Sequence, residues 1–254
     1  MKYGYMPSSS ADLFEEIAFA KEHFDFIELT LDENLSKYNK KYLQKLKRAL
    51  KNFAVYGHIH WKIRLYNKDK MEIEKAIKSI KIFKELGVKN LTTHPSWNKE
   101  MNEKDLIKNN LYSLKIINEF CKRHKLKLMI ENIQRSPFNR AKFLSKFVGQ
   151  IQNSKITFDT GHSAKVSRFE FSKFLKLRNQ IRHVHLHDCI NGFDHLDFKD
   201  KSKLKKVVNK IKNSGYNKTI TLEIFTTLKD KKQIELDYKK RRKILMEHLA
   251  KLKE

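Results

Sequence analysis

Apolar residues recur along the chain with two different periods. Short runs in which every second residue is apolar predict strands, and longer stretches with apolar residues three or four positions apart predict helices. Eight strands are expected in this way. They cover residues 2–6, 24–31, 54–61, 90–95, 126–133, 155–161, a histidine-rich stretch that begins at 181, and 218–225.

A predicted helix follows each of these strands. Ser10 is the expected N-cap of the first helix, and Gly87 is the expected C-cap of the third. The helices are expected at residues 10–23, 39–52, 71–86, 103–124, 139–152, 169–180, 200–213 and 231–253.

Eight strand–helix units in 254 residues match the size of a (β/α)8 TIM barrel. An open doubly wound sheet would normally carry a glycine-rich phosphate turn after its first strand, and Met6-Pro7-Ser8 is no such turn. No linker or low-complexity segment interrupts the pattern. We therefore predict an α/β fold, a single-domain TIM barrel over residues 1–254.

The histidine-rich stretch departs from an ordinary core strand. His183, His185 and His187 alternate with Val184 and Leu186, so the three imidazoles share one face of the strand. Neutral imidazole is a common metal ligand. A single histidine of this kind is more often satisfied by ordinary hydrogen bonds, so a metal site needs partners from other strands.

The other strands supply such partners. In a barrel, alternate residues of each strand face the interior, and the carboxyl ends of the strands carry the chemistry. So many acidic and imidazole groups at one mouth would be unfavourable without cations. Because no thiolate is among them, zinc, manganese, iron or cobalt is expected. The side chains opposite the apolar face are Glu28, His58, His60, His94, Glu131, Asp159 and Glu223.

The formal net charge of +26 suggests a polyanionic partner. Lysines are spread over every predicted helix, however, which fits a compositional habit or a heat-adapted surface equally well. The two cysteines, Cys121 and Cys189, fit a reducing cytoplasm. No run of eighteen apolar residues predicts a membrane span, and the polar N-terminus does not resemble a signal peptide. The pattern of apolar and polar residues does not predict an oligomeric state.

The chain resembles the xylose isomerase-like barrel superfamily, which includes sugar isomerases and epimerases and the endonuclease IV family. The resemblance covers essentially the whole chain, and its motifs occur in order at barrel spacing. The motifs are Phe-Asp-Phe-Ile-Glu-Leu (24–29), His58 before Trp61, Thr-His-Pro (93–95), Ile-Glu-Asn (130–132), Phe-Asp-Thr-Gly-His (158–162), His-Val-His-Leu-His-Asp (183–188), Asp-His-Leu (194–196) and Thr-Leu-Glu-Ile (221–224).

This resemblance implies a set of metal ligands. The core set is Glu131, Asp159, His185 and Glu223. Further ligands of a multinuclear zinc centre are matched by His58, His94, His162 and His195, so one to three divalent ions are expected. His60 competes with His58 for the strand-three place, and His183 and His187 are expected to support ligands or to pack.

The chain departs from the endonuclease IV pattern at two places. Phe193 stands two residues before the last histidine, where that family has an aspartate, which weakens the expectation of a full three-metal site. Asp197-Phe198-Lys199 runs directly towards the next helix, so the loop after the seventh strand is expected to be short.

Two functions remain open. One is a divalent-metal-dependent isomerase or epimerase of a small sugar or sugar phosphate, with a metal-stabilised enediolate and with Glu131 and Glu223 as the proton-transfer pair. The alternative is an endonuclease IV-like zinc hydrolase of abasic-site DNA. A metal-binding barrel without chemistry is a third reading, against which the intact ligand set argues. Substrate contacts are expected from Glu28, His60, Trp61 and Asp188.

Overall fold

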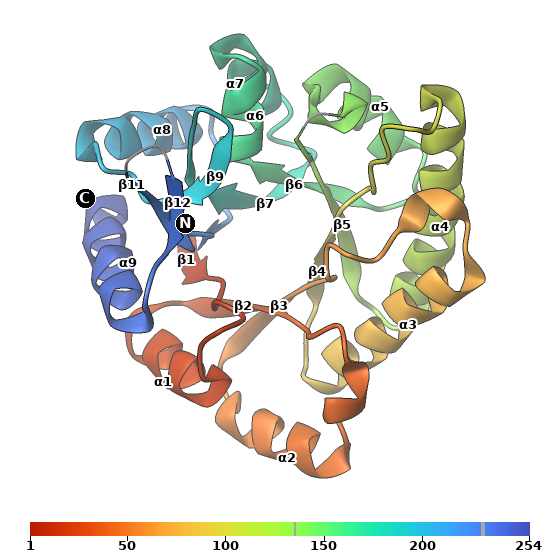
Figure 1. The fold of residues 1–254 in the computed structure, drawn as a ribbon, viewed down its shortest axis with the longest axis horizontal. Helices are drawn as coiled ribbons and strands as arrows, with labels where there is room; N and C mark the ends of the chain where they lie inside the picture. The colour runs from red at the N-terminus through yellow and green to blue at the C-terminus, as the bar shows by residue number, and fades with distance from the viewer. Residues whose placement is uncertain (135, 230–231) are drawn as a thin grey trace.

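Eight parallel strands close into a barrel in the order β1-β10-β7-β6-β5-β4-β3-β2 (Figure 1). The structure is a computed structural model that describes residues 1–134, 136–229 and 232–254. The predicted TIM barrel is confirmed. The barrel strands are β1 (Lys2–Tyr5), β2 (Phe26–Thr30), β3 (Ala54–His58), β4 (Asn90–Thr93), β5 (Lys127–Glu131), β6 (Lys155–Asp159), β7 (Ile181–Leu186) and β10 (Thr219–Leu222).

Helices surround the barrel on its outside (Figure 1). Short 3₁₀ turns at Leu35–Lys37, Leu65–Asn67 and Pro137–Asn139 connect some of the strands to them. Among the described residues, no helix combines the length and apolar character that a membrane crossing needs. The helices are α1 (Leu13–His23), α2 (Lys40–Ala49), α3 (Lys70–Glu85), α4 (Glu103–Arg123), α5 (Ala141–Gly149), α6 (Thr160–Val166), α7 (Arg168–Leu175), α8 (Lys201–Asn213) and α9 (Tyr238–Lys253).

The two faces of the barrel strands differ as the period-two pattern predicts. Buried aliphatic and aromatic residues such as Ile130, Phe158 and Val184 belong to the core cluster that includes residues of the helices. Many of the opposite positions are buried and polar, and some contact one another inside the barrel, as Thr92 and Thr157 do at 2.9 Å. The barrel interior therefore combines hydrogen-bonded polar side chains with a few apolar ones such as Phe26 and Met129, inside an apolar shell.

Several helix boundaries differ from those predicted. Asp12 caps α1 in place of Ser10, because its carboxylate accepts from the backbone N–H groups of Phe14 and Glu15. Helix α5 begins only at Ala141, because the Asn139 side chain bonds to Asn132 and to the carbonyl of His162. Strand β6 ends at Asp159 and not at 161, since the Asp159 carboxylate caps α6.

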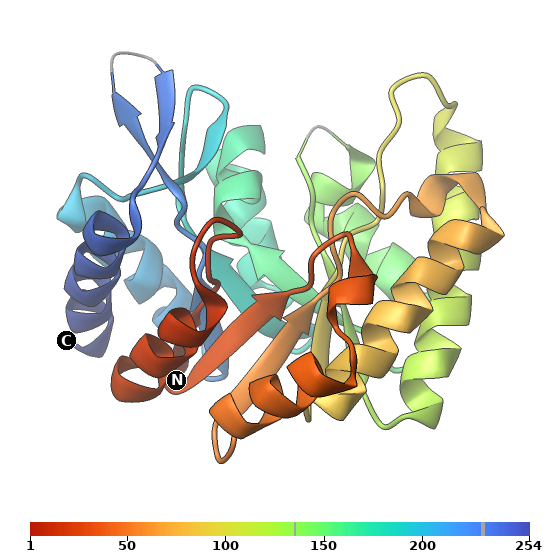
Figure 2. The same cartoon turned by 60° about the horizontal axis from the view of Figure 1, so that its bottom comes forward.

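Two hairpins at the barrel mouth correct the prediction more substantially. The segment after β7 is not a short loop but a hairpin of β8 (Asp188–Ile190) and β9 (Phe193–Leu196). The helix predicted over 231–253 starts at residue 231, which lies outside the described residues. Within the described part it begins only at Tyr238, because β11 (Thr226–Lys229) pairs with β12 (Lys232–Glu235). These strands form a second, four-stranded sheet. Figure 2 shows the β11–β12 hairpin projecting beyond one end of the barrel.

Candidate metal centre

Four donor side chains meet at the carboxyl ends of adjoining strands. Glu131 ends β5, Asp159 ends β6, His185 lies in β7, and Glu223 directly follows β10. One donor atom from each residue lies within 4.8 Å of the donor atoms of the other three, and all four side chains are buried. The structure thus brings together the four residues predicted as the core metal set.

Two buried atoms in this set face each other without forming a hydrogen bond. Nδ1 of His185 lies 3.2 Å from Oε1 of Glu131 and 3.0 Å from Oε2 of Glu223. Within the described part of the chain, His185 Nδ1 and Glu223 Oε2 have no hydrogen-bond partner. Buried polar atoms are normally satisfied, and a single divalent cation satisfies imidazole nitrogen and carboxylate oxygens together. The donor set therefore fits such a cation.

A second group of donors shares Glu131. Nε2 of His58 lies 3.1 Å and Nε2 of His94 lies 3.0 Å from Oε2 of this carboxylate. The three residues satisfy the same 4.8 Å criterion. His58 and His60 are both candidates by sequence for the metal ligand at the end of the third strand. Only His58 belongs to this group, whereas His60 stacks on Trp61 with the ring planes 21° apart.

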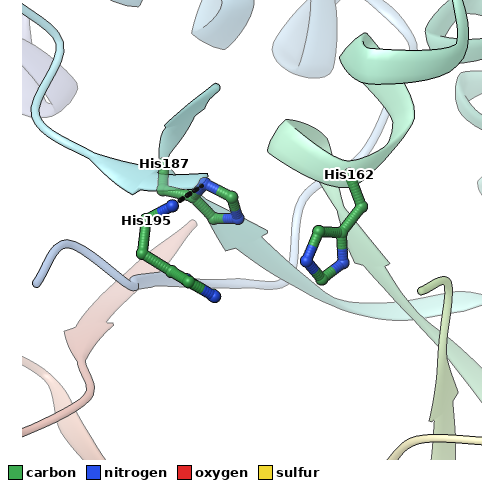
Figure 3. Close-up of side chains that lie close together, drawn as sticks. All are labelled: His162, His187 and His195. Carbon is green, nitrogen blue, oxygen red and sulfur yellow. Dashed lines mark hydrogen bonds between the residues drawn. The ribbon is translucent and has the colours of Figure 1, made fainter. Parts of the chain in front are cut away.

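A third group consists of three imidazoles, His162 from α6, His187 after β7 and His195 from β9. In Figure 3, His187 and His195 lie close together and His162 faces them from its helix. The backbone N–H of His195 donates to Nδ1 of His187 at 2.9 Å. His195 has a φ of 53° in the left-handed region, which is costly for a residue with a side chain. The fold thus maintains an unfavourable backbone conformation where it holds this ring.

A carboxylate also borders the three imidazoles. Oδ2 of Asp194 lies 3.7 Å from Nε2 of His162 and 4.0 Å from Nε2 of His195. Phe193 itself offers no metal donor where endonuclease IV has an aspartate. Two other donors, Asp194 and His187, lie beside His162 and His195. His187 also contacts the core metal set, since its Nε2 lies 2.8 Å from Oδ2 of Asp159.

The predicted substrate-contact residues occupy different environments. Glu28 is fully buried inside the barrel, where it contacts His183 and His185. Trp61 is 65% exposed, beside His60. Asp188 is buried, forms an ion pair with Lys203 and accepts a hydrogen bond from the backbone N–H of Cys189. These four residues are thus not brought together as one group.

The histidines of the site lower the pKa of two of its carboxylates, Glu131 and Glu223. Burial raises the pKa of Glu131, but His185 and His94 lower it by more than this, so that the pKa lies well below its usual range. Burial likewise raises the pKa of Glu223, and His185 and His195 bring it down to about 2. Burial lowers the pKa of His185, but Glu131, Glu28 and Glu223 raise it well above its usual value. These carboxylates therefore favour a proton on His185 when no cation is present.

One local signal for the β8–β9 hairpin is visible in the sequence. Asn191 and Gly192 have φ values of 51° and 88°. Asn-Gly is the preferred pair for a tight hairpin turn, which requires positive φ at both central residues. The pair predicts that the chain reverses here, and this reversal places His195 beside His187.

The comparisons with known proteins agree with this architecture. The family model described as "Xylose isomerase-like TIM barrel" matches residues 17–252. An uncharacterized protein of Methanocaldococcus jannaschii is 28% identical over 112 residues, which are 44% of this chain and 48% of that protein. The matched region thus spans about half the length of that relative.

Solved structures share the fold over nearly the whole chain. A D-tagatose 3-epimerase-like protein superposes with a TM-score of 0.76 and 24% identity, covering 100% of this chain and 98% of its own. A D-psicose 3-epimerase crystallised with D-fructose has a TM-score of 0.79 and 16% identity, with 98% and 97% covered. A probable 3-DHS dehydratase from Bacillus anthracis superposes with a TM-score of 0.73 and 14% identity. The match covers 100% of this chain and 99% of that protein. By its fold and by the match over residues 17–252, the chain belongs to the xylose isomerase-like TIM barrel family.

Proposed function

We propose that this chain is a divalent-metal-dependent isomerase or epimerase that acts on a small sugar or sugar phosphate. The observation that supports this most directly is the placement of two buried carboxylates, Glu131 and Glu223, at 3.2 Å and 3.0 Å from Nδ1 of His185. The sugar epimerases among the structural neighbours share the fold of this chain.

The proposed metal is zinc or manganese, with cobalt or iron as further candidates, because the donors are carboxylates and imidazoles without thiolates. A bound cation would hold two adjacent substrate oxygens and lower the free energy of an enediolate. Glu131, Asp159, His185 and Glu223 would hold it. Such a cation also gives His185 Nδ1 and Glu223 Oε2 the partner that the described protein atoms do not provide.

Glu131 and Glu223 are the proposed proton-transfer pair. One carboxylate takes the proton from the carbon next to the substrate carbonyl. The other first takes up a proton from solvent and gives it to the intermediate, and the first then loses its proton to solvent. Glu131 ends β5 and Glu223 follows β10, so the two carboxylates come from strands that β6 and β7 separate. His58 and His94 fix Oε2 of Glu131 and thereby hold its other oxygen towards the core set.

Deuterium exchange tests this proposal with a panel of candidate sugars. The protein, loaded with Mn²⁺, Co²⁺ or Zn²⁺, is incubated in D₂O with ketoses, aldoses and their phosphates, and exchange at carbon is followed by NMR. We expect exchange with at least one sugar, and its loss in Glu131→Gln and Glu223→Gln. The exposed Glu33→Gln variant is the matched control. Absence of exchange with every sugar, from protein shown to carry metal, would exclude the proposal.

A second candidate is a multinuclear hydrolase of phosphodiesters, with abasic-site DNA as its substrate. It is favoured by the two further donor groups, His58, His94 and Glu131, and His162, His187 and His195, and by the net charge of +26. Clustered cations activate a water and hold a phosphate. A labelled duplex with one abasic site is the test. Incision that requires metal and Glu131 would establish this function in place of the sugar reaction.

We also propose that the protein is located in a reducing compartment such as the cytoplasm. The chain has two cysteines, Cys121 and Cys189, and cysteines are usually kept reduced in that compartment. Redox-sensitive labelling of the thiols in cells of the source organism would test this.

A further inference from the structure

Glu28 lies inside the barrel with both carboxylate oxygens in contact with hydrogen-bond donors. Nε2 of His183 lies 2.9 Å from Oε2, and the hydroxyl of Thr221 donates to the same oxygen at 2.7 Å. Nε2 of His185 lies 3.3 Å from Oε1 and 3.2 Å from Oε2. The side chain is fully buried, which leaves no surface for a substrate in this conformation.

The two ring nitrogens of His185 have opposite surroundings. Nε2 faces Glu28 with hydrogen-bond geometry, whereas Nδ1 faces Glu131 and Glu223 and has no hydrogen-bond partner among the described residues. A neutral imidazole carries one N–H and one lone pair. When the N–H is on Nε2 and donates to Glu28, the lone pair lies on Nδ1 and points at the core metal set.

Glu28 is itself held in one orientation by its neighbours. His183 is fixed through Nδ1, which lies 2.7 Å from the hydroxyl of Thr219. The ring of Tyr56 packs over that of His183 at a centroid distance of 5.0 Å. Because His183 and Thr221 both bond to Oε2, rotation of the Glu28 carboxylate would break two buried hydrogen bonds.

Glu28, His183 and His185 could also hold an ion by distance alone. The hydrogen bonds argue against this. His183 and Thr221 already supply donors to Glu28 with good geometry, and an ion at this place would have to displace their protons. The unsatisfied atoms lie on the other side of the His185 ring, at Glu223 Oε2 and His185 Nδ1.

We propose that Glu28 is a positioning residue of the core metal site, which sets the orientation and tautomer of His185 through Nε2 so that Nδ1 binds the cation. This rests on the proposed metal centre. A carboxylate behind a metal-binding histidine is a general arrangement, and its removal typically lowers metal affinity by about 10–100-fold. Glu28 would act through His185 and not by touching the substrate.

The test is the affinity of Glu28→Gln for Zn²⁺ and Co²⁺, measured by competition with a chromophoric chelator. Glutamine keeps the size of the side chain but cannot accept all three donors. We expect binding weaker by about 10–100-fold and an altered visible spectrum of bound Co²⁺. Thr221→Val, which removes one donor to Glu28, should give a smaller change in the same direction. Glu170→Gln alters a buried carboxylate that bonds to the backbone N–H of Ala141, and should leave the affinity unchanged.

A double-mutant cycle separates positioning from general loosening of the structure. In a His185→Ala background, Glu28→Gln should change the affinity less than twofold, because the ring through which it acts is absent. Equal effects in both backgrounds would overturn the inference. So would unchanged affinity and an unchanged Co²⁺ spectrum in Glu28→Gln, even if only KM rose.

The failure of this inference differs from failure of the proposed function. If the wild-type protein binds no divalent cation, both are wrong. If the wild type binds metal and exchanges sugar protons while Glu28→Gln binds metal equally well, the inference alone is wrong.

Discussion

Nδ1 of His185 lies 3.0 Å from Oε2 of Glu223, and neither atom has a hydrogen-bond partner within the described residues. Both atoms are enclosed by the barrel, where unpaired polar atoms are costly. The pair is favourable when a proton or a cation lies between the two atoms and their neighbour Glu131. If a cation binds to the core set as proposed, it should replace a proton there, so metal binding should release protons.

Removal of the metal should lower the melting temperature. A ligand at a thousand times its Kd contributes about 4 kcal/mol to the free energy of unfolding, which corresponds to roughly ten degrees for a chain of this size. Scanning calorimetry with and without a strong chelator measures the shift. In the Glu131→Gln, Glu223→Gln double variant the chelator should have little effect. An identical shift in that variant would place the stabilising ion elsewhere.

The number of bound ions should depend on His58 but not on His60. His58 contacts Glu131 through Nε2, so His58→Gln should lower the occupancy of the group that it forms with His94. The ion held by Asp159, His185 and Glu223 should remain. His60→Gln is the matched control, because His60 stacks on Trp61. Native mass spectrometry counts the ions in each protein, and equal counts in wild type and His58→Gln would contradict the prediction.

The stability of the metal-free protein should fall as the pH rises above 6.5. Burial lowers the pKa of His162, but Asp159, Asp194 and Glu131 raise it to about 10. The folded state therefore binds the proton more tightly than the unfolded state. The resulting stabilisation is complete below the ordinary pKa near 6.5 and is lost as the pH rises through about 10.

Urea unfolding at a series of pH values measures this loss. His162→Gln should flatten the decline between pH 6.5 and 10. The pKa of His124, near the surface, lies below its usual value because of slight desolvation and the nearby Lys84, so His124→Gln should leave the decline unchanged. A wild-type stability that is constant across this range would refute the assignment.

Gly161 should be required for the position of His187. A Cβ added at Gly161 would lie closer than 3.0 Å to three atoms of the His187 ring, and the ring would have to move. We expect Gly161→Ala to destabilise the protein by about 1–3 kcal/mol and to weaken metal binding by the three imidazoles.

Gly149→Ala is the matched control for this substitution. Nothing lies within 4 Å of a Cβ at Gly149, the last residue of α5. The change should be neutral or stabilising by up to about 1 kcal/mol. Chemical denaturation compares both variants, and equal stabilities would show that His187 is free to shift.

The amino-acid sequence by itself determined the barrel and the direction of its side chains. Alternation of apolar and polar residues located the strands, and in a strand this alternation also decides which side chains face inward. Glu131, Asp159 and His185 were therefore predictable as interior residues near the strand ends. Sequence spacing was enough because neighbouring residues of one strand have a nearly invariant geometry.

Only the tertiary structure decided how these side chains are grouped. It assigned Glu28 to a buried position behind His185, placed Asp194 beside His162, and folded the segment after β7 into a hairpin that carries His195 to His187. Each relationship joins residues on different elements and depends on the distances between them. Such distances follow from strand register, helix caps and packing throughout the barrel, which no local period in the sequence records.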